Sequence, residues 1–156
     1  MYTFEKFYHV VEIGDIDSAK IICNAQPDLI KGKDKYGFSI LHGAVMDDKE
    51  ELINFLIEKG AEVNAKNDEG ITPLHIVLYP EIAEILIKKG ALVNCISDNG
   101  NTPLHSMAEN GDESLDEVKI LLKNGADKTL KNKSGETAYD IAKGREDKEM
   151  MKLLKP

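Results

Sequence analysis

Three regularly spaced histidines are the residues that first suggest chemistry. His42, His75 and His105 each end a similar six-residue stretch, whose fullest form is Gly-Ile-Thr-Pro-Leu-His at residues 70–75. Imidazole nitrogens can bind zinc or exchange protons. If each repeat advances a stack by one helix diameter, roughly 10 Å, these histidines lie too far apart to share one metal ion. We therefore expect them to be structural, with both ring nitrogens hydrogen-bonded between neighbouring loops.

Other reactive side chains form no recognisable site in the sequence. No nucleophile motif, Gly-rich phosphate loop or His-Glu-x-x-His stretch occurs. Cys23 and Cys95 are 72 residues apart, which favours neither a disulfide framework nor a zinc site. Asp68 and Asp98 each precede a glycine by two positions and fit turns better than calcium loops, because the other ligands are absent. We expect no catalytic residue, no cofactor and no metal, and therefore no enzyme.

The stretch that contains these histidines is itself a repeat. Its third position is Ser39, Thr72, Thr102 or Thr137 in successive copies, with steps of 33, 30 and 35 residues. Such a period is typical of stacked supersecondary units. Apolar residues at three- and four-residue spacing on both sides of a turn predict a helix pair in each unit. We expect a single domain, 1–156, with a cap at each end. Its five predicted units are 1–35, 36–68, 69–98, 99–133 and 134–156.

Two units depart from a regular length. In residues 69–98 the first helix is predicted to end near Tyr79 and the second to begin at Pro80, because proline suits the first helical position. About three residues are therefore missing from this turn. In residues 99–133 the corresponding turn, 109–114, is longer. Gly60 is expected to stop a helix in the left-handed conformation.

Linked motifs in several units make the sequence resemble ankyrin-repeat proteins over essentially its whole length. Thr-Pro-Leu-His occurs at 72–75 and 102–105, and Gly90-Ala91 and Val93-Asn94 lie between the two copies. The resemblance implies an all-α solenoid of stacked helix-turn-helix units with projecting β-hairpin-like loops. Ile40 departs from the pattern, since it stands where the motif has proline.

Charge limits the expected partners. The net charge is −8, and residues 36–98 hold 11 acidic against 5 basic side chains. This balance disfavours nucleic acid and mildly favours a partner with a basic surface, although a solvated acidic surface that keeps the protein soluble explains it better. No apolar run approaches the roughly 18 residues that a membrane span requires, and the N-terminus lacks a signal peptide. We expect a cytoplasmic monomer that binds no membrane.

The resemblance implies a function in binding proteins, through the concave helix face and the loops. Transferred to this sequence, it predicts these partner contacts from the loops and the first helices: Phe38, Met46, Asp47, Ile71, Ile76, Tyr79, Asn101, Ser106 and Glu109. The apolar members are expected at the centre of the surface, because the core does not obviously require them. Alternatively, Ile76 and Tyr79 pack between repeats.

Three classes of function stay open. One is a general protein-binding scaffold. Another is a dedicated inhibitor, immunity or effector-type protein that blocks one specific partner. The third, an enzyme with an unrecognised site, would require that an observed activity be lost when a concave carboxylate such as Glu109 is mutated.

Overall fold

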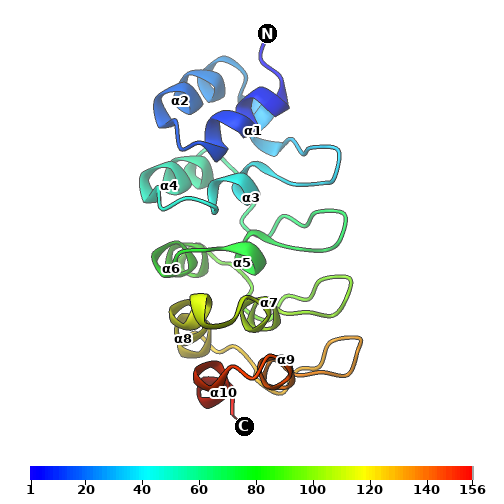
Figure 1. Ribbon diagram of the computed structural model, residues 1–156. Coiled ribbons are helices and arrows are strands. Elements are labelled where there is room, and N and C mark those ends of the chain that lie inside the picture. The colour runs from blue at the N-terminus through cyan, green and yellow to red at the C-terminus, as the bar shows by residue number, and fades with distance from the viewer. Residues whose placement is uncertain (156) are drawn as a thin grey trace.

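The chain forms a stack of helix pairs, and the computed structural model describes residues 1–155 (Figure 1). The described residues hold ten α-helices and two short 3-10 helices, η1 (Pro27–Lys31) and η2 (Gly111–Ser114). The α-helices are α1 (Phe4–Glu12), α2 (Ile16–Ala25), α3 (Ile40–Ala44), α4 (Glu50–Glu58), α5 (Pro73–Ile76), α6 (Pro80–Lys88), α7 (Pro103–Asn110), α8 (Leu115–Lys123), α9 (Ala138–Gly144) and α10 (Lys148–Leu154).

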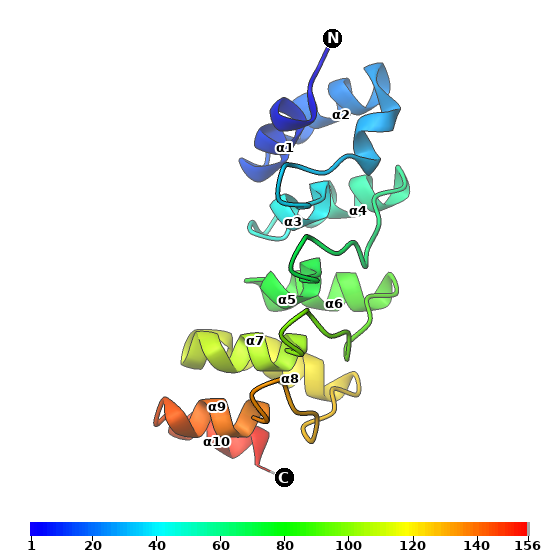
Figure 2. The ribbon, with the colours of Figure 1, turned by 90° about the vertical axis from the view of Figure 1, so that its right-hand side faces the viewer.

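Two rows of helices make the two layers of the solenoid (Figure 2). The odd-numbered helices α1 to α9 contact one another in sequence, and α4, α6, α8 and α10 do the same in the second row. Leucines fill the space between the rows because one stripe of each short helix is apolar. Buried leucines of this kind are Leu41, Leu74, Leu104, Leu56, Leu86 and Leu121. The predicted all-α solenoid is confirmed.

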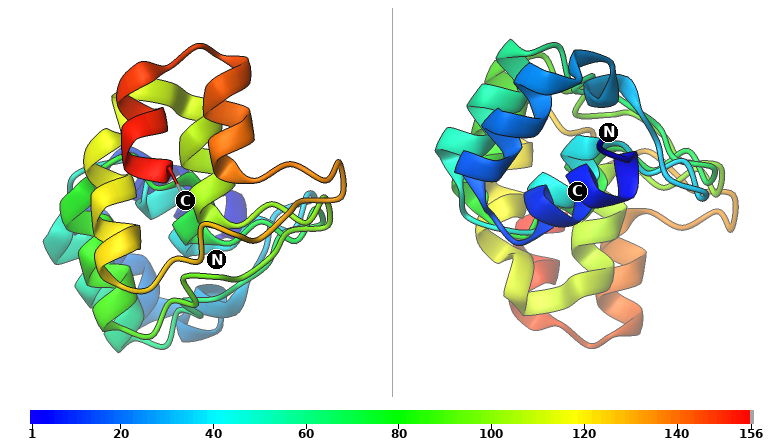
Figure 3. Two further views of the ribbon diagram at one scale, coloured as in Figure 1. Left: turned by 90° about the horizontal axis from the view of Figure 1, so that it is seen from below. Right: turned by 90° about the horizontal axis from the view of Figure 1, so that it is seen from above.

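A loop projects to one side before each of α3, α5, α7 and α9, and these four loops lie above one another (Figures 1 and 3). Backbone hydrogen bonds join their tips, from Asp98 N–H to the Glu69 carbonyl at 2.8 Å and from Lys133 N–H to the Asn99 carbonyl at 2.9 Å. Gly70 has φ +72°, and a Cβ there would lie 2.7 Å from the Asp98 carboxylate. The tip therefore requires glycine, both for its backbone angle and for the close approach of the next loop.

The predicted end of the first helix in residues 69–98 is wrong. Helix α5 ends at Ile76, and Val77 is extended with φ −61° and ψ 138°. Tyr79 is also extended, at φ −127° and ψ 128°, as expected before a proline. Extended residues advance about 3.3 Å each against 1.5 Å in a helix, so three of them can span a turn that lacks residues. The predicted start of the second helix at Pro80 is confirmed.

Candidate functional site

The three motif histidines have the same hydrogen-bond arrangement. In His75, Nδ1 lies 3.2 Å from the backbone nitrogen of Thr72 and 2.8 Å from its hydroxyl, and Nε2 lies 3.0 Å from the Asn101 carbonyl. A backbone N–H can only donate and a carbonyl can only accept. Nδ1 is therefore the acceptor, and Nε2 carries the proton that it donates to the next loop.

The same pattern recurs in the neighbouring repeats. His42 Nε2 lies 3.0 Å from the Ile71 carbonyl, and His105 Nε2 lies 3.1 Å from the Glu136 carbonyl. Each imidazole thus caps the start of its own helix and binds the following repeat, in the manner of a capping box. The predicted loop-tying role is confirmed.

Burial favours the neutral form of two of these imidazoles, His42 and His75. It lowers the pKa of His75 from 6.5 to about 4, although the bond to the Asn101 carbonyl opposes the shift. Burial also lowers the pKa of His42. Within residues 1–155, no three His, Cys, Asp or Glu side chains are placed to hold a metal ion. The bonds of the motif histidines to the following loops assign them to building the repeat stack.

The loop residues predicted to contact a partner lie just before the first helices. Phe38 and Ile71 are half-buried, and the Phe38 ring stands edge-on to His42 with 5.3 Å between centroids. Asn101 is also half-buried, and its side chain accepts from Asn132 Nδ2 at 3.0 Å. Phe38, Ile71 and Asn101 occupy equivalent places in successive repeats, and the carbonyls of the last two bind the motif histidines.

The helix residues predicted to contact a partner fall into two groups. Ile76 and Ser106 are half-buried and equivalent by repeat. Glu109 is exposed, and its carboxylate accepts from Asn101 Nδ2 at 3.0 Å, so the structure brings these two predicted residues together. Met46 and Tyr79, which stand at the place of Glu109 in the preceding repeats, are 45% and 36% exposed. Asp47 follows Met46 and lies 3.8 Å from the Lys49 ammonium.

A small pocket lies beside Tyr79, and we call it the Tyr79 pocket. It has a volume of about 250 Å³ and is lined by Asp48, Glu50, Tyr79, Glu81 and Ile82. Three carboxylates therefore line the pocket together with Tyr79, and that of Asp48 lies 3.3 Å from the Lys49 ammonium. Glu50 and Glu81 lie in the first turns of α4 and α6, where negative charge complements the helix dipole. The pocket thus combines an aromatic face with negative charge, a combination that suits a cationic side chain.

Leu78 is an exposed residue that the sequence reasoning missed. Its equivalents Val45 and Ala108 are fully buried, yet Leu78 is 46% exposed. The early end of α5 explains the difference, because successive side chains of an extended backbone point to opposite sides, so that Val77 stays buried and Leu78 turns outward. The signal in the sequence is the short distance between Leu74 and Pro80.

Glu117 is a buried carboxylate in the first turn of α8. It is only 3% exposed, and burial raises its pKa, with Asp116 and Glu81 adding to the effect.

Comparison with known families matches most of the chain to one family. A model for ankyrin repeats in three copies matches residues 7–96, and a second ankyrin-repeat model matches residues 80–142. The chain belongs to the ankyrin-repeat family. The resemblance noted in the sequence is therefore confirmed.

Several curated ankyrin-repeat relatives align with part of this chain. Protein phosphatase 1 regulatory subunit 27 of Mus musculus is 30% identical over 80 residues, which cover 49% of this chain and 52% of the relative. Ankyrin repeat and SOCS box protein 5 of Homo sapiens is 37% identical over 60 residues, 38% of this chain and 18% of the relative. Alpha-latrocrustotoxin-Lt1a of Latrodectus tredecimguttatus is 34% identical over 64 residues, 41% of this chain and 4% of the toxin. This ankyrin-repeat chain thus spans from one twenty-fifth to about half of these relatives' lengths.

Ankyrin repeats generally mediate protein–protein interactions, and the relatives fit that role. Among residues 1–155, no helix is both long and apolar enough to cross a membrane. For this ankyrin-repeat protein, the site to be explained is therefore a surface that another protein can contact.

Proposed function

We propose that this protein is a non-catalytic binding module that engages a protein partner at the Tyr79 pocket and the residues around it. The observation that carries the proposal is the exposure of Tyr79 beside the carboxylates of Asp48, Glu50 and Glu81, next in the chain to the exposed Leu78. Exposed apolar side chains rimmed by polar groups are typical of binding surfaces.

The chemistry of the pocket favours a basic side chain on the partner. An arginine of the partner would stack on the Tyr79 ring and pair with the carboxylates of Glu50 and Glu81, since Asp48 already pairs with Lys49. Met46 stands one repeat before Tyr79 and extends the apolar surface. The remaining predicted contacts are assigned to the periphery of this surface: Phe38, Asp47, Ile71, Ile76, Asn101, Ser106 and Glu109.

The partner is to be identified by affinity capture on the immobilised protein, and then measured against variants. Tyr79→Ala should raise the dissociation constant about tenfold or more, because it removes the aromatic anchor of the pocket. Ile21→Ala is the matched control, since Ile21 is 59% exposed but lies on α2. An unchanged affinity in a folded Tyr79→Ala protein contradicts the proposal. So does an equal loss in the control.

A second candidate is a regulatory role toward one enzyme, as a dedicated inhibitor. The alignment with a protein phosphatase 1 regulatory subunit, over 52% of that protein, favours it. If the captured partner is an enzyme, adding this protein should lower its activity with the same dependence on Tyr79. Binding without any change in activity would leave the scaffold role and exclude the inhibitor.

A further inference from the structure

One loop position is a lysine in three of the four loops and an isoleucine in the third loop, which lies between α6 and α7. We call the segment between each even-numbered helix and the next loop tip the entering strand. Lys33, Lys66, Ile96 and Lys131 occupy the same place in successive entering strands. Lys33 Nζ donates to the Lys66 carbonyl at 2.7 Å, and Lys66 Nζ donates to the Ile96 carbonyl at 2.8 Å. Ile96 has no donor, so it makes no such bond to the Lys131 carbonyl.

The residue after Ile96, which is Ser97, also departs from the pattern of the other loops. The side chains of Asp34, Asn67 and Asn132 each accept two backbone N–H bonds from their own loops, at 2.8–3.0 Å. Ser97 stands at this place in the third loop, and the structure of residues 1–155 gives its hydroxyl no such bonds. The junction between the third and fourth loops thus lacks the lysine bridge to the next loop as well as the side-chain brace within its own.

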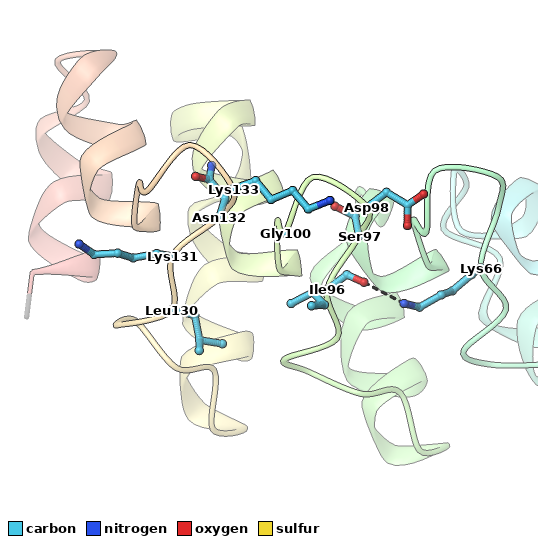
Figure 4. Close-up of a pocket in the computed structure, with 9 residues that line it drawn as sticks. All are labelled: Lys66, Ile96, Ser97, Asp98, Gly100, Leu130, Lys131, Asn132 and Lys133. Atoms are coloured by element: carbon cyan, nitrogen blue, oxygen red, sulfur yellow. Dashed lines mark hydrogen bonds between the residues drawn. The ribbon is translucent and has the colours of Figure 1, made fainter.

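A groove of about 530 Å³ opens at this junction (Figure 4). Its apolar surface comes from Ile96, which is 54% exposed, and from Leu130 on the facing strand. The other lining residues are Lys66, Ser97, Asp98, Gly100, Lys131, Asn132 and Lys133. An aliphatic side chain this exposed gains free energy when another molecule covers it.

The groove is positively charged although the chain is acidic. Three lysines and one aspartate line it, in a protein of net charge −8. Lys66 is held at one edge by its bond to the Ile96 carbonyl, and Lys133 lies along the side of Gly100 (Figure 4). The groove therefore attracts acidic groups, the reverse of the Tyr79 pocket.

We propose that this groove binds an extended segment of a partner protein in which one large aliphatic or aromatic side chain is flanked by acidic residues. The apolar side chain covers Ile96 and Leu130, and the flanking carboxylates pair with Lys66 and Lys133. A backbone N–H of the segment donates to the Lys131 carbonyl, in place of the lysine that bridges the other junctions. This surface lies on the entering strands, away from the Tyr79 pocket, and the inference does not depend on the function proposed there.

The test is an NMR titration of the ¹⁵N-labelled 156-residue chain with a synthetic peptide. The peptide has one leucine with two glutamates on each side, and two control peptides replace the leucine by serine or the glutamates by lysine. Saturable amide shifts are expected at Ile96, Leu130 and Lys133 with the first peptide only.

Ile96→Lys is the decisive variant, because it adds positive charge but restores the bridging lysine and fills the groove. We expect it to weaken peptide binding about tenfold, through the loss of the apolar contact. Attraction by charge alone predicts the opposite, since the variant is more basic. Ile21→Lys adds the same charge on α2 and should leave the affinity unchanged.

Three outcomes would overturn the proposal. One is equal binding of the serine peptide, and another is unchanged or tighter binding by Ile96→Lys. The third is groove shifts that appear without peptide as the protein concentration rises, since they would assign the groove to a second copy of this chain.

Discussion

Acidification from pH 7 to about 5 should destabilise the fold by about 2 kcal/mol through His75 alone. Burial lowers the pKa of this imidazole from 6.5 to about 4, so the unfolded chain takes up a proton that the folded chain refuses. The stabilisation is fully present above pH 6.5 and is lost as the pH falls toward 4. The whole shift corresponds to about 3 kcal/mol, and most of it is lost by pH 5.

Other groups that titrate in this range can be separated from His75. The lowered pKa of His42 acts in the same direction. The raised pKa of Glu117 acts in the opposite direction, because the folded state then binds the proton more readily as the pH falls. The Glu117→Gln background removes that contribution. The lowered carboxylate pKa values of Asp15 and Asp140 matter only below about pH 4, outside the range.

Urea unfolding followed by circular dichroism, at several pH values between 7 and about 5, measures the effect. The His75→Gln variant should lose stability at pH 7, where it lacks the imidazole bonds, but should show a slope of stability with pH that is shallower by up to one proton. In the folded parent protein, the NMR signal of the His75 ring should stay unchanged over this range. A ring that titrates near pH 6.5 in the folded state would refute the reasoning.

Two further predictions follow from the loops. Gly70→Ala should cost about 1 kcal/mol or more in urea unfolding, because φ is +72° and the added Cβ meets the next loop, whereas Gly144→Ala in α9 meets nothing within 4 Å and should not destabilise. A loss as large in the α9 variant would show that the loop contact is not the cause. Ile96→Lys should raise the free energy of unfolding by about 0.5–1 kcal/mol, because the new lysine bridges to the fourth loop as its equivalents do. A less stable variant would contradict the bridge.

The fold and the role of the histidines could be predicted because both depend on short-range patterns that recur. A motif whose histidine caps its own helix is visible within four residues, and the repetition rules out a shared metal site. Gly60 was likewise predicted in the left-handed conformation, and its φ is +99°. Local spacing was sufficient in these cases.

The exposed surfaces were harder to predict, because they depend on how neighbouring repeats meet. Leu78 reads as a core residue by its place in the repeat, and only the early end of α5 turns it outward. Ile96 is unremarkable as a single residue. Its effect appears only when Lys33 and Lys66 are seen to bridge adjacent loops, a contact between residues about 30 positions apart.

The imidazole bonds give the stack a direction. Every motif histidine donates toward the C-terminal side, from His42 to His105. Asp140 takes the place of the imidazole in the last pair, where it accepts from Thr137 but has no proton to offer onward. Deleting residues 134–156 therefore removes the Glu136 carbonyl to which His105 donates, whereas deleting the first helix pair removes no acceptor of a motif histidine. Trimming this protein from its two ends should consequently have unequal effects.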